Sequence, residues 1–223
     1  MTHSRIISSN QQGIHEKLET VVRRHLTSLF KRPFPDYSLR AFEQAQHVIA
    51  QHSGPIILDS FCGVGESTIN IAQQHPEALV IGIDKSSHRL NKHSENYGDN
   101  STQNYYLLQA DVDDFWRLAV EAGWQLYKHY LLYPNPWPKS AQLKRRVHGS
   151  ALFPTLLQLG GDIELRSNWP IYVEEFAQAL TIAGFPAKAE SFSTAKPITP
   201  FERKYSHSGQ DLWRCSCALS KPD

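Results

Sequence analysis

The sequence predicts an α/β protein with a doubly wound, mostly parallel sheet and an N-terminal helical extension. From Pro55 onward, short apolar or β-branched runs of strand length alternate with helical patterns. This alternation produces crossover connections and a parallel sheet covered by helices on both faces. A length of 223 residues suits one such domain with a short appendage. The composition, with 40% hydrophobic and 20% charged residues, excludes a largely disordered or fibrous chain.

The first part of the chain is expected to be helical, with residues 1–52 as the extension and residues 53–223 as the main domain. Apolar residues recur at helical spacing within Gly13–Leu29 and predict an amphipathic helix. Pro33 and Pro35 end that pattern, because proline disrupts a helix interior. A second helix is expected over Ser38–Gln51.

The main domain is expected to hold five parallel strands with helices between them. The strands are predicted at Ile56–Asp59, Leu79–Asp84, Tyr105–Leu108, His129–Tyr133 and Asp162–Ser167. The helices are predicted at Ser67–Gln74, Ser86–Tyr97, Asp113–Glu121, Ser150–Leu159 and Pro170–Gly184. Two last strands, Lys188–Ser193 and Leu212–Leu219, are expected to pair at one edge, where an antiparallel arrangement is open to them. The polar stretch Thr194–Gln210 between them is interpreted as a long functional loop.

Acidic residues stand at the ends of three successive predicted strands. Asp59 ends the first, Asp84 ends the second and Asp111 follows the third. Open α/β sheets bind ligands at the carboxyl ends of their strands. After Asp59, Gly63 and Gly65 allow positive φ and a close approach of the backbone to a ligand. A single aspartate would be interpreted as a turn or cap residue, but three in register predict a nucleoside site.

The glycine turn distinguishes between nucleoside cofactors. A dinucleotide-binding turn has the pattern G-x-G-x-x-G, whereas Phe61 replaces its first glycine here and the third glycine is absent. S-adenosylmethionine has no phosphate but carries an ammonium group, a ribose and an adenine. Asp59 suits the amino-acid moiety, Asp84 the ribose and Asp111 the adenine amino group. The residues therefore favour a methyltransferase over a dehydrogenase.

A proline-rich stretch, Pro134 to Lys139, follows the fourth predicted strand. The prolines stiffen the backbone, Asn135 can aim its side-chain oxygen at an acceptor, and Trp137 can stack on a flat base. The net charge of +1 gives no global footprint for nucleic acid, so a polyanion would need a local patch. The basic residues predicted to contact phosphates are Lys139, Lys144, Arg145 and Arg146.

These motifs resemble the bacterial tRNA (guanine-N7)-methyltransferases. Where that family has P-D-P-W-x-K, K-R-R, T-D-W and T-x-F-E-x-R, this chain has Pro134–Lys139, Lys144–Arg146, Ser167-Asn168-Trp169 and Thr199–Arg203. Order and spacing agree from about Ile56 to Trp213. The resemblance implies a Rossmann-like class I methyltransferase fold, S-adenosylmethionine as cofactor, and transfer to N7 of a guanine in tRNA.

The resemblance also implies roles for individual residues. Cofactor contacts are implied at Asp59, Asp84 and Asp111, around the turn that holds Gly63 and Gly65. Asn135 is implied as the catalytic-site residue, also beside the cofactor. The residues implied to contact the RNA substrate, apart from the basic run, are Asn168, Thr199, Glu202 and Arg203.

The chain departs from the family pattern at three positions. Asn135 and Asn168 stand where the family has aspartates, and Phe61 replaces the usual first glycine of the cofactor turn. Guanine N7 carries no proton, so its methylation needs positioning and electrostatics rather than a base. The paired loss of charge is interpreted as altered specificity. Two alternatives stay open: a methyltransferase acting on an exocyclic amino group or a small molecule, and a non-catalytic RNA-binding paralogue.

Other properties of the sequence are mostly exclusions. Three cysteines cannot form a disulfide framework and no histidines show ligand spacing, so no metal is expected. No apolar run approaches the ~20 residues of a membrane span. The N-terminus lacks the apolar core of a secretory signal, which predicts a cytoplasmic protein. A monomer or a homodimer is expected.

Overall fold

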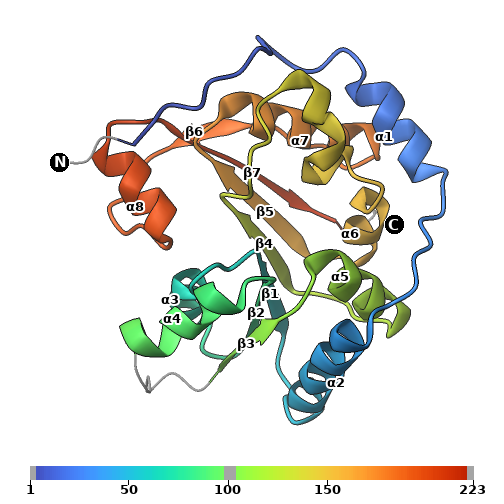
Figure 1. Ribbon diagram of the computed structural model, residues 1–223, viewed down its shortest axis with the longest axis vertical. Helices are drawn as coiled ribbons and strands as arrows, with labels where there is room; N and C mark the ends of the chain where they lie inside the picture. The colour runs from blue at the N-terminus through green and yellow to red at the C-terminus, as the bar shows by residue number, and fades with distance from the viewer. Residues whose placement is uncertain (1–3, 98–103, 220–223) are drawn as a thin grey trace.

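The computed structural model describes residues 4–97 and 104–219 and shows a seven-stranded sheet with helices on both faces (Figure 1). Its helices are α1 (Leu18–Leu26), α2 (Asp36–Ala50), α3 (Glu66–Gln74), α4 (Ser87–Tyr97), α5 (Val112–Glu121), α6 (Phe153–Gln158), α7 (Pro170–Ile182) and α8 (Pro200–His207), with 3-10 helices η1 (Ser140–Arg145) and η2 (Val147–Gly149). Its strands are β1 (Ile56–Ser60), β2 (Leu79–Asp84), β3 (Tyr105–Gln109), β4 (Lys128–Leu132), β5 (Asp162–Ser167), β6 (Glu190–Phe192) and β7 (Leu212–Ala218).

The sheet confirms the predicted fold class. Its strand order is β3-β2-β1-β4-β5-β7-β6. The first five strands in this order are parallel, and β7 lies antiparallel between β5 and β6. The predicted strands are all present and differ only at their ends. Strand β1 pairs with β2 on one side and with β4 on the other, so the strand order reverses at β1. Open α/β sheets bind their ligands at such a switch point.

Both faces of the sheet are buried, as a parallel sheet requires. Neighbouring residues of one strand point to opposite faces. Leu58 of β1 therefore belongs to the larger apolar core, together with α1, α2, α5, α6 and α7, whereas Ile57 belongs to a smaller core with α3. Val80 and Ile81 of β2 divide in the same way.

The N-terminal helices share the larger core. Helix α1 packs against α6 and α7, and α2 packs against α5 (Figure 1). The Phe42 ring lies 5.2 Å from the Phe115 ring and 5.1 Å from the Trp124 ring. Helix α1 is shorter than the predicted Gly13–Leu29, because residues preceding it are held by hydrogen bonds to distant parts of the chain.

The predicted loop over Thr194–Gln210 is wrong in its centre, where α8 forms. Thr199 caps this helix, since its Oγ1 accepts a hydrogen bond from the Glu202 backbone N–H at 2.9 Å. Pro200 occupies the first helical position, where proline's missing N–H costs nothing. A helix-start signal was thus present, within a stretch whose polar composition is typical of loops.

Candidate active site

A cleft of about 1130 Å³ opens at the carboxyl ends of the parallel strands. Its cofactor side is formed by the turn after β1, the end of β2 and the start of α5. Its acceptor side is formed by the segments after β4 and β5 and by α8. Residues of these segments that line it are Phe61, Gly63, Asp84, Asp111, Asp113, Tyr133, Asn135, Asn168, Thr199, Phe201 and Tyr205.

The turn after β1 has the left-handed backbone that its glycines allow. Gly63 has a φ of 62°, lines the cleft and has open space where a side chain would stand. Gly65 has a φ of 76°, does not line the cleft, and would press a side chain against Leu107 and His93. Gly63 therefore leaves room for a ligand, whereas Gly65 permits close packing beneath the turn.

Asp59 is fully buried under this turn and does not line the cleft. Its Oδ2 accepts hydrogen bonds from the Ser67 hydroxyl at 2.6 Å and the Thr68 hydroxyl at 2.7 Å. Its Oδ1 has no hydrogen-bond partner among the described residues. Burial raises the pKa of Asp59 to about 6, against the effect of the two hydroxyls. The structure thus places Asp59 behind the turn and not in direct contact with the cleft.

Asp84 and Asp111 both line the cleft and both have cationic partners. Asp84 accepts hydrogen bonds from the Gly63 N–H at 3.0 Å and from Arg89 Nη1 at 3.3 Å. Asp111 Oδ2 accepts from Lys85 Nζ at 2.9 Å, and its Oδ1 caps α5. Burial would raise the pKa of Asp111, but the hydrogen bond and the charge of Lys85 outweigh it and lower that pKa.

Asp113 is a cleft residue that the sequence reasoning missed. It lies in the first turn of α5, and burial together with the charge of Asp111 raises its pKa to about 6. The available signal was its position, two residues after a strand-end acid. It adds a further carboxyl group to the cleft lining, beside Glu66, Asp84 and Asp111.

The acceptor side brings together Asn135, Asn168 and Thr199, as the motifs implied. Asn168 Nδ2 donates to Gln210 Oε1 at 2.8 Å. In the segment after β4, Tyr133 and Trp137 have φ values of 52° and 45°. Within the described residues these two and Phe61 are the non-glycine residues with positive φ, and strained backbone of this kind concentrates at functional sites.

Three aromatic side chains line the acceptor side. The Phe201 and Tyr205 rings stack at 6.2 Å, and the Tyr205 ring lies 5.6 Å from the Tyr133 ring. Phe201 is 48% exposed. Trp137, which the sequence favoured for stacking on a base, does not line the cleft and instead lies against the Arg145 guanidinium at 4.8 Å.

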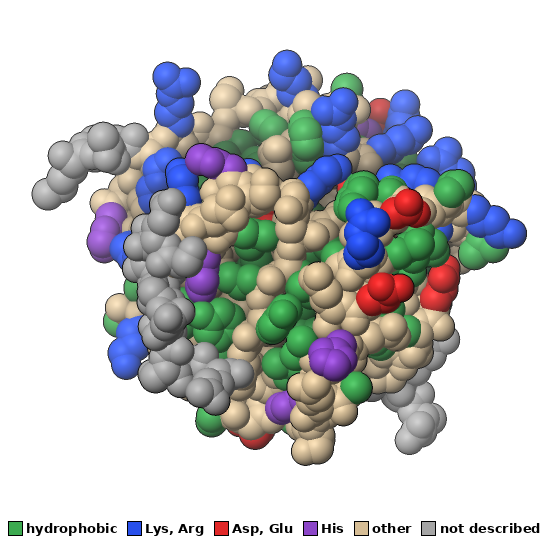
Figure 2. Space-filling view, turned by 60° about the horizontal axis from the view of Figure 1, so that its bottom comes forward, with side chains coloured by type: hydrophobic (Ala, Val, Ile, Leu, Met, Phe, Trp, Pro, Cys, Tyr) green, Lys and Arg blue, Asp and Glu red, His purple; other side chains and the backbone are tan. Residues whose placement is uncertain are grey.

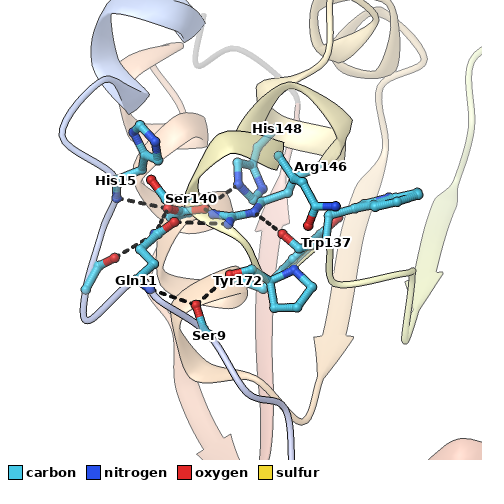
Figure 3. A network of polar contacts seen from close by, with 12 residues as sticks. Ser9, Gln11, His15, Trp137, Ser140, Arg146, His148 and Tyr172 are labelled. Atoms are coloured by element: carbon cyan, nitrogen blue, oxygen red, sulfur yellow. Dashed lines mark hydrogen bonds and ion pairs between the residues drawn. The ribbon is translucent and has the colours of Figure 1, made fainter.

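The basic run after β4 divides into exposed and buried members. Lys139, Lys144 and Arg145 are exposed. Arg146 is fully buried, so the prediction that it contacts phosphate is wrong for this structure. Its guanidinium forms an ion pair with Glu175 at 2.5 Å and donates to the Trp137 carbonyl at 3.2 Å (Figure 3).

The Arg146 network also holds the segment before α1. Gln11 Oε1 accepts from Arg146 Nη2 at 3.0 Å, and the His15 backbone N–H donates to Glu175 Oε1 at 2.9 Å (Figure 3). Burial would raise the pKa of Glu175, but hydrogen bonds from His148 and Arg146 and their charges lower it to about 2. The paired Arg146 and Glu175 side chains fix the proline-rich segment to α7.

Glu202 is also buried and does not line the cleft, which corrects the implied substrate contact. Its carboxylate accepts hydrogen bonds from the Tyr133 hydroxyl at 3.0 Å, Arg166 Nη1 at 2.8 Å and the Ile198 N–H at 2.8 Å. It therefore supports the cleft wall from behind. Arg203 is exposed, lies outside the lining and forms an ion pair with Glu66, which does line the cleft.

No helix in the described ranges combines the length and the apolar character needed to cross a membrane. No group of three or more His, Cys, Asp or Glu side chains in the same ranges is arranged to hold a metal ion.

Residues 53–215 match the model of a protein family described as "Putative methyltransferase". The chain belongs to this methyltransferase family. It is 25% identical over 195 residues to a protein of Saccharophagus degradans named tRNA (guanine-N(7)-)-methyltransferase, a match that covers 82% of this chain and 85% of that protein. A protein of the same name from Geobacillus thermodenitrificans is 27% identical over 185 residues, covering 79% and 84% of the two chains.

Solved structures of methyltransferases share the fold. The 16S rRNA methyltransferase KamB aligns with a TM-score of 0.57 and 18% identity, covering 84% of this chain and 95% of that one. The 16S rRNA (adenine(1408)-N(1))-methyltransferase of Catenulisporales acidiphilia, solved as a point mutant with cosubstrate SAM, aligns with a TM-score of 0.53 and 16% identity, covering 86% and 95%. The predicted Rossmann-like class I fold of this methyltransferase is confirmed.

Proposed function

We propose that this methyltransferase transfers a methyl group from S-adenosylmethionine to N7 of a guanine in tRNA, in the cytoplasm. The observation that carries the proposal is the cleft itself. It joins the strand-end acids Asp84 and Asp111 to Asn135, Asn168 and Thr199, which stand at the positions of the tRNA (guanine-N7)-methyltransferase motifs. The relatives bearing that name support the same substrate.

The cofactor side fits S-adenosylmethionine. Gly63 leaves space in the lining for a ligand to approach the backbone. The carboxylates of Asp84 and Asp111 suit the ribose hydroxyls and the adenine amino group, and Val112 provides apolar surface beside Asp111. Asp59, with its unpartnered buried Oδ1, is the group that would compensate the ammonium charge from behind the turn.

The cofactor supplies an electrophilic methyl group when bound, and the protein positions the acceptor. Guanine N7 has a lone pair and no proton, so no side chain is needed as a base. Asn135 stands at the lip of the cleft on a segment fixed by prolines and by the Arg146 network. Holding the base in line with the methyl group is then the main contribution to the rate.

The exposed cations Lys139, Lys144 and Arg145 are proposed to bind phosphates of the tRNA. They follow the acceptor segment directly, and all three residues are exposed. In Figure 2 most of the Lys and Arg side chains gather in the upper half of the face shown. On this face, a chain with a net charge of only +1 thus presents its positive charge unevenly.

The test is methyl transfer to tRNA that lacks the modification, followed by mass analysis of its nucleosides. The expected product is 7-methylguanosine, together with cofactor binding measurable by calorimetry. Asp84→Ala is the control and should abolish both. A different methylated nucleoside would assign another acceptor atom, and cofactor binding without transfer to any tRNA would refute the proposal.

A further inference from the structure

The segment before α1, residues 4–15, runs along the acceptor side of the molecule, and we name it the N-terminal strap. Figure 1 shows it passing from beside α8 across the top of the view to α1. The Ser9 hydroxyl donates to the Pro138 carbonyl at 2.5 Å, and the Ser140 N–H donates to Asn10 Oδ1 at 3.0 Å. The strap therefore contacts the acceptor segment after β4.

The strap also contacts the turn between α8 and β7, through Ser4. The Ser4 N–H donates to the Ser208 hydroxyl at 3.1 Å, and the Ser4 carbonyl accepts from Gln210 Nε2 at 3.0 Å. Gln210 Oε1 in turn accepts from Asn168 Nδ2 at 2.8 Å. The Gln210 backbone is held as well, since its N–H donates to the Tyr205 carbonyl at 3.1 Å.

Only one orientation of the Gln210 and Asn168 amide groups satisfies this chain of hydrogen bonds. A carbonyl oxygen can only accept, so the Ser4 carbonyl requires the NH₂ group of Gln210 on its side. The side-chain oxygen of Gln210 must then face Asn168, whose NH₂ group donates a hydrogen bond to it. The amide oxygen of Asn168, a residue that lines the cleft, is the polar atom that remains for a ligand.

We propose that the N-terminal strap, acting through Gln210, fixes the amide of Asn168 so that an acceptor oxygen faces the target base. Asn168 is thereby a specificity-determining residue, and Ser4 and Gln210 are positioning residues. The proposal rests on the function proposed above. The oxygen suits the N1–H and N2 amino donors of guanine, whereas adenine has a bare acceptor at N1 and no amino group at C2.

The relay of hydrogen bonds from Ser4 through Gln210 to Asn168 gives a physical reason for asparagine at position 168. An aspartate at 168 would also offer an oxygen to the base, but its other oxygen would face Gln210 Oε1 with no proton between them. Gln210 could turn its amide toward the aspartate only by losing the Ser4 carbonyl. Asparagine keeps the acceptor toward the base and satisfies the relay at the same time.

Four full-length proteins separate the effect of the Asn168 orientation on methylation from the effect of the relay on stability. They are wild type, Asn168→Asp, Gln210→Arg and the double variant. Arginine only donates, so in Gln210→Arg the guanidinium can bind both the Ser4 carbonyl and the Asn168 oxygen. That arrangement turns the Asn168 NH₂ group toward the base. In the double variant the introduced guanidinium pairs with the introduced carboxylate, whose second oxygen faces the cleft again.

The rate of tRNA methylation is expected to depend on whether residue 168 presents an acceptor oxygen to the base. Gln210→Arg should lower kcat/KM by about tenfold to a hundredfold, because a donor would meet the guanine donors. Asn168→Asp should lower kcat/KM less than Gln210→Arg does, because its carboxylate still offers an acceptor oxygen, and the double variant should recover most of the activity that Gln210→Arg loses. The added cation would by itself strengthen tRNA binding, so it cannot account for a loss.

Stability against unfolding in urea is expected to depend instead on whether the hydrogen bonds of the relay are satisfied. Asn168→Asp should be the least stable of the four, and the double variant should regain the wild-type midpoint. A Gln210→Arg variant as active as wild type, or a double variant as inactive as Gln210→Arg, would overturn the proposal. If wild type methylates no tRNA while the stability pattern holds, the relay is supported and the proposed function fails.

Discussion

Phe61 adopts a left-handed φ of 66° in the turn where the related motif has glycine. Its ring makes an edge contact with Trp116 at 6.0 Å, and Trp116 is anchored by donating to the Ser60 hydroxyl at 3.0 Å. The ring contact is what holds the strained backbone. The turn therefore reaches the glycine conformation without glycine, at some cost in backbone energy.

Comparing Phe61→Gly with Phe61→Ala isolates that backbone cost. Both variants lose the ring contact, but only glycine relieves the positive φ. We expect Phe61→Gly to be more stable than Phe61→Ala by about 1 kcal/mol, the reverse of the usual order of the two residues. Urea unfolding measures the difference, and an alanine variant that is equally stable would show that the turn is not strained.

Asp59 makes the folded state sensitive to pH. The folded protein holds the Asp59 proton up to about pH 6, whereas an unfolded chain releases it near its ordinary pKa of 3.8. The folded state binds more protons in this interval, so stability falls as pH rises from about 4 to about 6. Ionisation at neutral pH therefore opposes folding, although the charge suits a cationic ligand.

Asp59→Asn should remove this part of the pH dependence. We expect its free energy of unfolding at pH 7 to exceed that of wild type by about 1–3 kcal/mol, while S-adenosylmethionine binds more weakly. Urea titrations at several pH values and calorimetry measure the two effects. Asp162→Asn, at an exposed aspartate, is the control. An unchanged slope between pH 4 and 6 would contradict the assignment to Asp59.

The sequence could predict the positions of the site residues better than their exposure. Asp84 and Asp111 follow from the register of parallel strands, which always end at the same edge of the sheet. Arg146 was misassigned because three consecutive basic residues look alike in sequence. Only the packing of η2 against α7 decides which of them meets Glu175.

At the scale of elements, η1 and η2 place two adjacent arginines in opposite environments. Arg146→Ala would remove the guanidinium that compensates the buried Glu175 carboxylate and should destabilise the protein by about 3–5 kcal/mol. Arg145→Ala removes an exposed side chain and should change stability by no more than about 0.5 kcal/mol. Urea unfolding of both variants measures the contrast, and equal losses would contradict the role assigned to the Arg146 cluster.

Helix α8 supplies the aromatic surface of the acceptor side. Under the proposed function, Phe201→Ala should raise the KM for tRNA by about tenfold, because stacking on a base is worth about 1–3 kcal/mol. Phe201→Tyr should retain the wild-type KM. Tyr127, 50% exposed and outside the cleft lining, gives the control Tyr127→Ala. Equal KM values for wild type and Phe201→Ala would show that Phe201 does not contact the RNA.

Helix α8 was also the element that sequence patterns missed. Its exposed positions are mostly polar, and its buried member is the charged Glu202, whose burial depends on Tyr133 after β4 and Arg166 in β5. A helix that buries a carboxylate has no apolar periodicity to reveal it. The central strands β1 and β2, by contrast, are almost fully buried and begin with continuous apolar runs that sequence inspection detects readily.

At the scale of the whole molecule, the parallel sheet follows from the alternation of strands and helices, but the N-terminal strap does not. Ser4 and Gln210 lie at nearly opposite ends of the chain, and one hydrogen bond joins them. No sequence periodicity or motif indicates such a contact. The division into an extension and a main domain is therefore a division of sequence pattern, since the extension shares the core and hydrogen-bonds to the segment after β4.

The uneven charge of the molecule leads to a last prediction, on the salt dependence of tRNA binding. The variant replaces Lys139, Lys144 and Arg145 by glutamine. If each cation neutralises one phosphate, the slope of log K against log salt should become less negative by about 2–3. The control makes the same change in net charge at exposed cations outside the segment after β4: Lys17, Arg40 and Lys188. Because long-range attraction depends on net charge while counterion release depends on contacts, only the first variant should change the slope strongly. Filter binding from about 50 to 200 mM salt measures both variants, and equal slopes would exclude the basic run as the phosphate site.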